Sequence, residues 1–303
     1  MTEAASSVRI ILDGAIDYAG LFPPAKLDMS SAVRNHASYR AGEHAWALGR
    51  FIVPVDRLDE LDTAARGLLP RAQSDRPWRI SALLGSEIRN DVGKILEFNA
   101  QHSQPANGMA VIDAVEFKAT TPDQIYHSLE AVPASITRHV EIPIDNDPAE
   151  LVSAIAQSRG RAKVRTGGTT QDAFPTSHEL ARFIHACTNA NVPFKATAGL
   201  HHPIRSTYPL TYDQGSPKGK MFGFLNVILA AALVRAGVSV QETQELLEEE
   251  SMAALRFDGD GVRWRTRMIG TLALKDARTR IMLSFGSCSF TEPIDDLRKL
   301  NLL

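Results

Sequence analysis

The chain has 303 residues, of which 44% are hydrophobic and 22% are charged, and its formal net charge is −2. This composition is typical of a globular protein, and the near-neutral charge without a Lys/Arg run argues against a nucleic-acid partner. The longest apolar run, residues 221–234, is short for a membrane span and contains Asn226, so we expect no membrane partner.

The N-terminus and the cysteine content together predict a cytoplasmic protein. Residues 1–7 have neither a basic segment nor an apolar core, so we expect no signal peptide. Cys187 and Cys288 are too few for a disulfide framework, which fits a reducing compartment.

Eight candidate strands alternate with helices along the chain. The strands are predicted at residues 10–20, 50–55, 78–84, 114–118 and 139–144, within 161–168 and 193–202, and at 281–285. Helices are predicted over 30–41, 56–69, 90–101, 222–236, 239–249, 267–279 and 292–300, and others begin at 121, 147 and 176. The expected helix starts are Asp56, Thr121-Pro122, Asp147-Pro148, and Thr176 with Glu179 as a capping box.

This alternation predicts a single (β/α)8 barrel (a TIM barrel) formed by residues 1–303. An open doubly wound sheet is the main alternative, but it would usually carry a glycine-rich loop after its first strand, and residues 14–24 contain no GxGxxG. Residues 203–280 break the rhythm between the seventh and eighth strands. There we expect an inserted helical and hairpin region, with a lid over 203–220 and a hairpin over 255–264.

Charged residues alternate with apolar ones in several of these strands. Lys163 and Arg165 share one face while Ala162 and Val164 share the other, and Lys195 opposes Phe194 and Ala196. Because the apolar set must face the helices, we expect the charged set inside the barrel. That set comprises Glu116, Lys118, Glu141, Lys163, Arg165 and Lys195, with Asp17 from the first strand. The excess of cations favours an anionic substrate at the C-terminal face.

A lysine amine in such a place attacks a carbonyl group and forms a Schiff base, which needs a depressed lysine pKa. A nearby second cation and partial desolvation supply that depression, so Lys163 and Lys195 on neighbouring strands fit the chemistry. Glu116 would move protons during carbinolamine formation and dehydration. The alternative is a buried salt-bridge layer without chemistry, which is costly as mere scaffolding.

Three short motifs resemble those of the class I deoxyribose-phosphate aldolases. Residues 163–167 (KVRTG) are similar to that family's Schiff-base strand, residues 195–199 (KATAG) to its next strand, and residues 285–289 (FGSCS) to its phosphate-binding strand end. The resemblance implies a lyase that makes or cleaves a C–C bond. In it Lys163 is the nucleophile, Lys195 lowers its pKa and Glu116 carries protons. No cofactor and no metal are expected.

The chain also departs from that family. Arg165 replaces a small residue, Glu116 stands where the family uses aspartate, Lys118 is extra, and the chain ends in Asn301-Leu-Leu303 rather than in a tyrosine. Arg165 suits a carboxylate, so a keto acid is as plausible a substrate as a sugar phosphate. The residues expected to contact this small anionic carbonyl compound are Asp17, Lys118, Glu141, Arg165, Gly167, Gly168, Thr197, Ala198, Gly199, His201, His202, Gly286, Ser287, Cys288 and Ser289.

Two other functional classes stay open. His201 and His202, with barrel carboxylates, are candidate ligands of a metal-dependent hydrolase, isomerase or lyase, although no HxH or HExxH spacing is present. A barrel that binds an anion without catalysis is the second alternative. Cys288 is a candidate nucleophile, but its place between two serines favours anion contact or core packing. The sequence leaves a homo-oligomer open.

Overall fold

The structure is a computed structural model that describes residues 3–72 and 74–303, with side chains from residue 6 onward. Residues 1 and 2, which belong to the stretch examined for a signal peptide, lie outside the described residues. Within the described part of the chain, no helix is long and apolar enough to cross a membrane.

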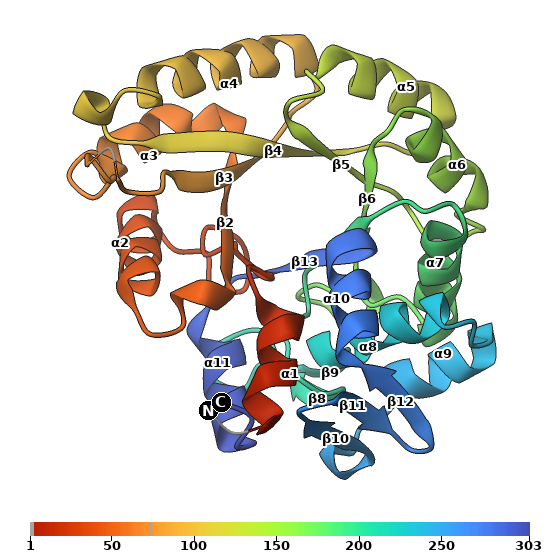
Figure 1. Cartoon of the computed structure of the whole chain (residues 1–303). Coiled ribbons are helices and arrows are strands. Elements are labelled where there is room, and N and C mark those ends of the chain that lie inside the picture. Colours follow the sequence, from red (N-terminus) through yellow and green to blue (C-terminus); the bar gives the residue numbers. More distant parts are fainter. Residues whose placement is uncertain (1–2, 73) are drawn as a thin grey trace.

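Eight parallel strands close into a barrel and alternate with helices, so the predicted (β/α)8 fold is confirmed (Figure 1). The strands, in the order that they occupy around the barrel, are β1 (Ile16–Tyr18), β13 (Met282–Ser287), β7 (Phe194–Thr197), β6 (Arg161–Arg165), β5 (Thr137–Glu141), β4 (Ala110–Lys118), β3 (Trp78–Leu83) and β2 (Leu48–Pro54). The helices that follow these strands are α2 (Met29–Ala41), α3 (Leu58–Ala65), α4 (Ile88–His102), α5 (Pro122–Ala131), α6 (Ala149–Gln157), α7 (Ser177–Asn189), α8 (Phe224–Arg235) and α11 (Thr291–Lys299). Short 3-10 turns are η1 (Ala45–Ala47), η2 (Val55–Arg57), η3 (Pro105–Asn107), η4 (Gln171–Ala173) and η5 (Met252–Ala254).

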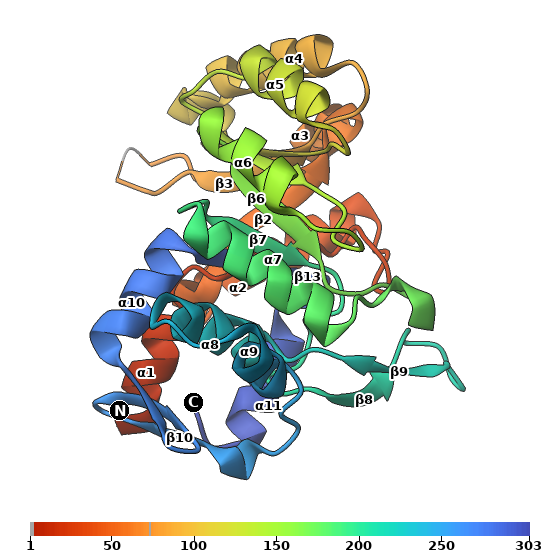
Figure 2. The same cartoon turned by 90° about the vertical axis from the view of Figure 1, so that its right-hand side faces the viewer.

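The insertion between β7 and β13 is more regular than the sequence predicted. The segment expected as a lid is a β-hairpin of β8 (Ser206–Pro209) and β9 (Lys218–Met221), which projects from the body of the molecule (Figure 2). After α8 and α9 (Val240–Leu247) comes a three-stranded antiparallel sheet of β10 (Leu255–Asp258), β11 (Gly261–Trp264) and β12 (Arg267–Gly270). Helix α10 (Thr271–Arg280) leads into β13.

The predictions for two elements, a helix in the insertion and the first strand, were wrong in part. The helix expected over 267–279 begins only at Thr271, because residues 267–270 pair with β11 and bury Ile269 beside Val262. The strand expected over 10–20 is helix α1 (Glu3–Leu12) followed by the short β1. Val8, Ile11 and Leu12 are fully buried at helical spacing, so the apolar run belongs to a helix face.

The helix starts are confirmed at two positions and differ at two. The Thr121 side chain accepts a hydrogen bond from the Gln124 amide, and Thr176 forms the predicted capping box with Glu179. Asp56 lies inside η2, so α3 starts after Arg57 without a side-chain cap. Pro148 is the cap residue of α6, and Asp147 accepts a hydrogen bond from the Ala149 amide instead.

Helix α8 accounts for the long apolar run. Residues 224–234 are all buried, because α8 contacts α7, α9, α10 and β13. Asn226 is satisfied in this core: its amide nitrogen donates to the carbonyls of Leu246 (2.8 Å) and Glu249 (2.9 Å), and its oxygen accepts from the Arg205 amide (2.9 Å). A buried amide with three partners does not carry the penalty of an unpaired polar group.

Candidate active site

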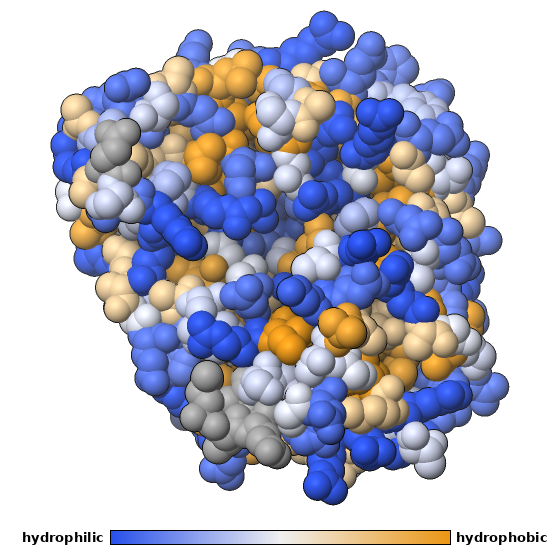
Figure 3. All heavy atoms as spheres, in the orientation of Figure 1, coloured by the Kyte–Doolittle hydropathy of each residue, from blue (hydrophilic) through white to orange (hydrophobic). Residues whose placement is uncertain are grey.

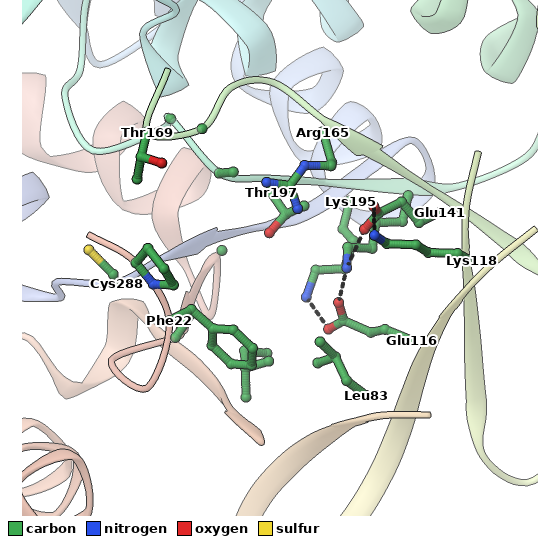
Figure 4. A pocket seen from close by; sticks show the side chains of 18 of the residues that line it. Phe22, Leu83, Glu116, Lys118, Glu141, Arg165, Thr169, Lys195, Thr197 and Cys288 are labelled. Atoms are coloured by element: carbon green, nitrogen blue, oxygen red, sulfur yellow. Dashed lines mark hydrogen bonds and ion pairs between the residues drawn. The ribbon is translucent and has the colours of Figure 1, made fainter. Parts of the chain in front are cut away.

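A cavity of about 540 Å³ opens at the C-terminal ends of the barrel strands. Its floor is charged, and the charged side chains come from β4, β5, β6 and β7 (Figure 4). Of the residues predicted to form the site, the following line this cavity: Glu116, Lys118, Glu141, Lys163, Arg165, Gly168, Lys195, Thr197, Ala198, Gly199, His201, Gly286 and Cys288.

Glu116 lies at the centre of the floor and bridges the two lysines. Its Oε2 is 2.8 Å from Lys163 Nζ, and its Oε1 is 2.8 Å from Lys195 Nζ. Each ammonium has a second carboxylate: Lys163 Nζ lies 2.8 Å from Glu141 Oε2, and Lys195 Nζ lies 2.5 Å from Asp17 Oδ2. All five side chains are buried, so the floor is an alternating network of three carboxylates and two ammonium groups.

The strand register places these groups. Lys163 is the direct partner of Lys195 on β7 and of Glu141 on β5, so the three side chains emerge at one level of the barrel. Asp17 is fixed by the Arg50 amide, which donates to its Oδ1 (2.8 Å), and by Ser284 Oγ, which donates to its Oδ2 (2.8 Å). Gly49 allows this close approach, because a Cβ there would collide with Asp17 Oδ1.

A second ion-paired layer closes the barrel below the floor. Arg50 donates two hydrogen bonds to Asp113 (2.6 and 3.0 Å), and Arg79 also binds Asp113 (2.7 Å). Figure 3 shows the face at which the barrel strands begin, where hydrophilic side chains gather around the centre. The charged floor is therefore reached from the opposite, C-terminal face.

Protonation in the floor follows from these contacts. Burial raises the pKa of Glu116, but the Lys163 and Lys195 ammonium groups outweigh burial and hold that pKa well below its ordinary value. Burial also lowers the pKa of Lys163, but Glu116 and Glu141 more than offset it, so the pKa of Lys163 is raised. This is opposite to the depression that a neighbouring Lys195 was expected to cause. The bridging carboxylate between the two lysines is the physical reason.

The two cations at the rim differ from the buried pair. Lys118 is exposed, with its Nζ 3.8 Å from Glu141 Oε1. Arg165 is also exposed, and among the described residues it has no carboxylate within ion-pair distance; its Nη2 lies 3.5 Å from the Gly167 carbonyl. The free positive charge of the cavity is therefore concentrated at Arg165.

The small residues predicted to approach an anion divide into two groups. The chain leaves β7 through a tight turn at Ala198 and Gly199, with φ of 63° and 73°, and both residues line the cavity beside Gly168 and Gly286. Gly167, Ser287 and Ser289 do not line it. A Cβ on Gly167 would collide with the Phe174 ring, so that position packs under a side chain.

Ser287 and Ser289 have structural partners instead. Ser287 is buried, with its Oγ 3.2 Å from His201 Nδ1, and Ser289 Oγ accepts a hydrogen bond from the Glu292 amide (3.1 Å) at the start of α11. Asp17 lies beneath Lys195 and outside the cavity lining. These three residues, predicted to contact the substrate, therefore do not line the cavity and contact other side chains or the backbone around it instead.

Sequence reasoning missed an apolar wall. It consists of Phe22, Pro23, Pro24, Ile52, Leu83 and Leu84, with Leu210 and Met221 from the β8–β9 hairpin. Nothing in the sequence pattern showed that the proline-containing turn at residues 21–24 faces the site. His139 was also missed: it is buried and is the register partner of Glu116 on the neighbouring strand, and burial followed by the charge of Lys195 lowers its pKa to about 3.

The histidines form a separate cluster on the wall opposite the lysines. His201 Nδ1 lies 3.8 Å from Cys288 Sγ and 3.4 Å from Glu292 Oε2. His202 does not line the cavity: its Nδ1 is 2.6 Å from Asp296 Oδ2, and its ring stacks on Tyr208 at 3.6 Å. Across residues 3–72 and 74–303, no group of three His, Cys, Asp or Glu side chains is placed to hold a metal ion.

The comparisons with known proteins add no identification. Family models, curated proteins and solved structures were all compared with the chain, and none of the three comparisons gives a match. The assignment of a function therefore rests on the sequence, the barrel and its cavity.

Proposed function

We propose that the protein is a lyase of the Schiff-base aldolase type, acting on a small anionic carbonyl compound through an imine on Lys163. The observation that carries the proposal is the position of Lys163 Nζ, which lines the cavity and lies 2.8 Å from both Glu116 and Glu141. An amine with two carboxylates in contact has a proton acceptor and a proton donor for each step of imine formation.

Lys163 is the better nucleophile of the two lysines. Lys195 is held between Asp17 and Glu116 at the base of the network, and its side chain is 1% exposed against 7% for Lys163. In this assignment Lys195 keeps Glu116 ionised. It does not need to lower the pKa of Lys163 directly.

The raised pKa of Lys163 means that the resting group is an ammonium, so activation must include a proton transfer. A carbonyl compound that fills the cavity displaces water. Without that water, the ammonium–carboxylate pair loses stability relative to the neutral pair of amine and carboxylic acid. Glu116 or Glu141 then takes the proton. The free amine adds to the carbonyl carbon, and the protonated carboxyl returns the proton to the carbinolamine oxygen, which leaves as water.

The cavity also limits the substrate. Arg165 supplies an unpaired guanidinium suited to a carboxylate or a phosphate, and the apolar wall faces the same space. A keto acid with an apolar substituent uses both features, whereas a polyhydroxylated sugar phosphate uses only the first. The order of the lysine strands and the glycine-serine strand end, which resembles the aldolase pattern, agrees with this class of reaction.

Borohydride trapping tests the proposal. The folded protein is incubated with aldehydes and keto acids, reduced, digested and mapped by mass spectrometry, with Lys163→Met and Lys195→Met as paired variants. We expect a reduced adduct on Lys163 and its loss in Lys163→Met. If no compound modifies Lys163, and Lys163→Met makes or cleaves the C–C bond as fast as the wild type, the imine mechanism is refuted. Reversible ligand binding without trapping would identify a binding barrel instead.

A further inference from the structure

A second reactive group faces the same cavity. Cys288 follows β13 and lines the wall that lies across from Glu116 and Lys195 (Figure 4). It is buried, with 4% exposure, but it opens into the cavity, whereas Cys187 is fully buried in α7.

Cys288 is surrounded by groups suited to an ionised thiol. His201 Nδ1 lies 3.8 Å from its Sγ, and that same nitrogen lies 3.4 Å from Glu292 Oε2. Tyr212, on the loop of the β8–β9 hairpin, places its hydroxyl 3.4 Å from Cys288 Sγ and 3.0 Å from Glu292 Oε2, so its single proton can be donated to either group. A carboxylate beside the imidazole stabilises the imidazolium form, and an imidazolium stabilises a thiolate.

The other titratable groups facing Cys288 do not oppose this arrangement. Burial raises the pKa of Tyr18 to about 12, and the pKa of Tyr212 is raised further, so both phenols stay neutral. Burial opposes a charge on His201, but Cys288 and Glu292 raise its pKa to about 9. Burial raises the pKa of the Cys288 thiol, and the hydrogen bond and charge of His201 lower it by more, so its net shift is downward. Burial raises the pKa of Cys187 well above its ordinary value, which makes it an inert reference.

We propose that Cys288 is a second nucleophile of this cavity, an ion-paired thiolate that adds to α,β-unsaturated carbonyl compounds. The Sγ–C bond forms at the β-carbon of the compound, and the π electron pair moves to the carbonyl oxygen as an enolate. The proton of the His201 imidazolium ends on the α-carbon, so the addition is balanced without another reactant. The apolar wall beside Cys288 suits the carbon skeleton of such a compound, and the reaction does not depend on imine formation at Lys163.

The test is the pH dependence of labelling by N-ethylmaleimide, itself an α,β-unsaturated carbonyl compound. Rates are measured on the full chain from pH 6 to 8 by intact mass, with peptide mapping to separate Cys288 from Cys187 and a cysteine-containing tripeptide as reference. An ordinary thiol with pKa about 8.5 loses nearly tenfold in rate for each pH unit below it. We expect the rate on Cys288 to fall with decreasing pH much less steeply than the rate of the tripeptide, and we expect no label on Cys187.

His201→Gln provides the matched comparison. An ordinary thiol is only about 0.3% thiolate at pH 6, and the lower nucleophilicity of a low-pKa thiolate offsets part of the gain from ionisation. We therefore expect the variant to react at least about tenfold more slowly than the wild type at pH 6. Cys288→Ser should remove the label. A wild-type rate parallel to that of the tripeptide, or a folded protein in which Cys288 stays unlabelled, overturns the proposal even if His201→Gln does not fold.

Discussion

Replacing Glu116 by glutamine tests whether the charged floor is held together as the distances indicate. The carboxylate contacts two buried ammonium groups at 2.8 Å each, and it accepts a hydrogen bond from Ser81 at 2.7 Å. Glutamine has nearly the same shape, but it leaves two ammonium groups with only Asp17 and Glu141. Removing one partner of a buried ion pair costs about 3–5 kcal/mol, because the charge that stays behind lacks compensation.

The assay is urea unfolding at pH 7, analysed for the free energy of unfolding. Folding lowers the pKa of Glu116, so its contribution is complete above its unfolded pKa of about 4.3 and shrinks as the pH falls below that. We expect Glu116→Gln to lose about 3–5 kcal/mol at pH 7. Glu242→Gln is the surface control: Glu242 pairs with Arg267 at 2.5 Å, and because this arginine is exposed to solvent, we expect a much smaller loss than that of Glu116→Gln.

A double-mutant cycle separates charge from shape. Adding Lys163→Met to Glu116→Gln removes the ammonium that lost its partner, so the combined loss should be smaller than the sum of the single losses by about 2 kcal/mol or more. Strictly additive losses would contradict the network, as would a Glu116→Gln protein as stable as Glu242→Gln. Either result would mean that the lysines of the floor are neutral or hydrated at pH 7.

Two further predictions concern other groups. His36 is buried against Trp78 at 4.5 Å, and burial lowers its pKa to about 3, so its stabilisation is present above pH 6.5 and is lost as the pH falls towards 3. When the pH falls from 6.5 to 5, the wild type should therefore lose about 2 kcal/mol more of its unfolding free energy than His36→Phe loses. Equal losses in the two proteins would contradict a neutral buried imidazole. Arg165→Gln should raise the keto acid concentration needed for half-maximal trapping about tenfold or more. The concentration of a neutral aldehyde needed for half-maximal trapping should hardly change. An equal effect on both would remove Arg165 from anion binding.

The barrel and the inward direction of its charged residues could be predicted from the sequence because both depend on local alternation. Lys163 must face opposite to Ala162 and Val164 in any strand, and burying the two apolar side chains among the helices turns the lysine inward. The same local reasoning failed for residues 10–12. There an apolar run fits a strand and a helix face equally well, and only packing of Val8, Ile11 and Leu12 decides between them.

The features of the site that could not be predicted from the sequence depend on contacts between distant segments. His201, Cys288 and Glu292 meet because β13 brings Cys288 beside the segment that follows β7, and α11 then returns a carboxylate to the same imidazole. The apolar wall likewise joins the turn after β1 to side chains of β2, β3 and the β8–β9 hairpin. Neither arrangement has a spacing or motif that marks it along the chain.

The surroundings of the two proposed nucleophiles shift their pKa values in opposite directions. On the lysine wall, Glu116 and Glu141 raise the pKa of Lys163, the first proposed nucleophile, so in the proposed mechanism the reaction begins only when a ligand moves the proton from Lys163 to a carboxylate. On the thiol wall, His201 contacts Cys288, the second proposed nucleophile, and lowers the pKa of its thiol before any ligand enters. A compound that reacts first with Cys288 would occupy the space that Lys163 needs. Prior labelling with N-ethylmaleimide should therefore suppress borohydride trapping on Lys163, whereas trapping that continues undiminished would show that the two walls serve separate spaces.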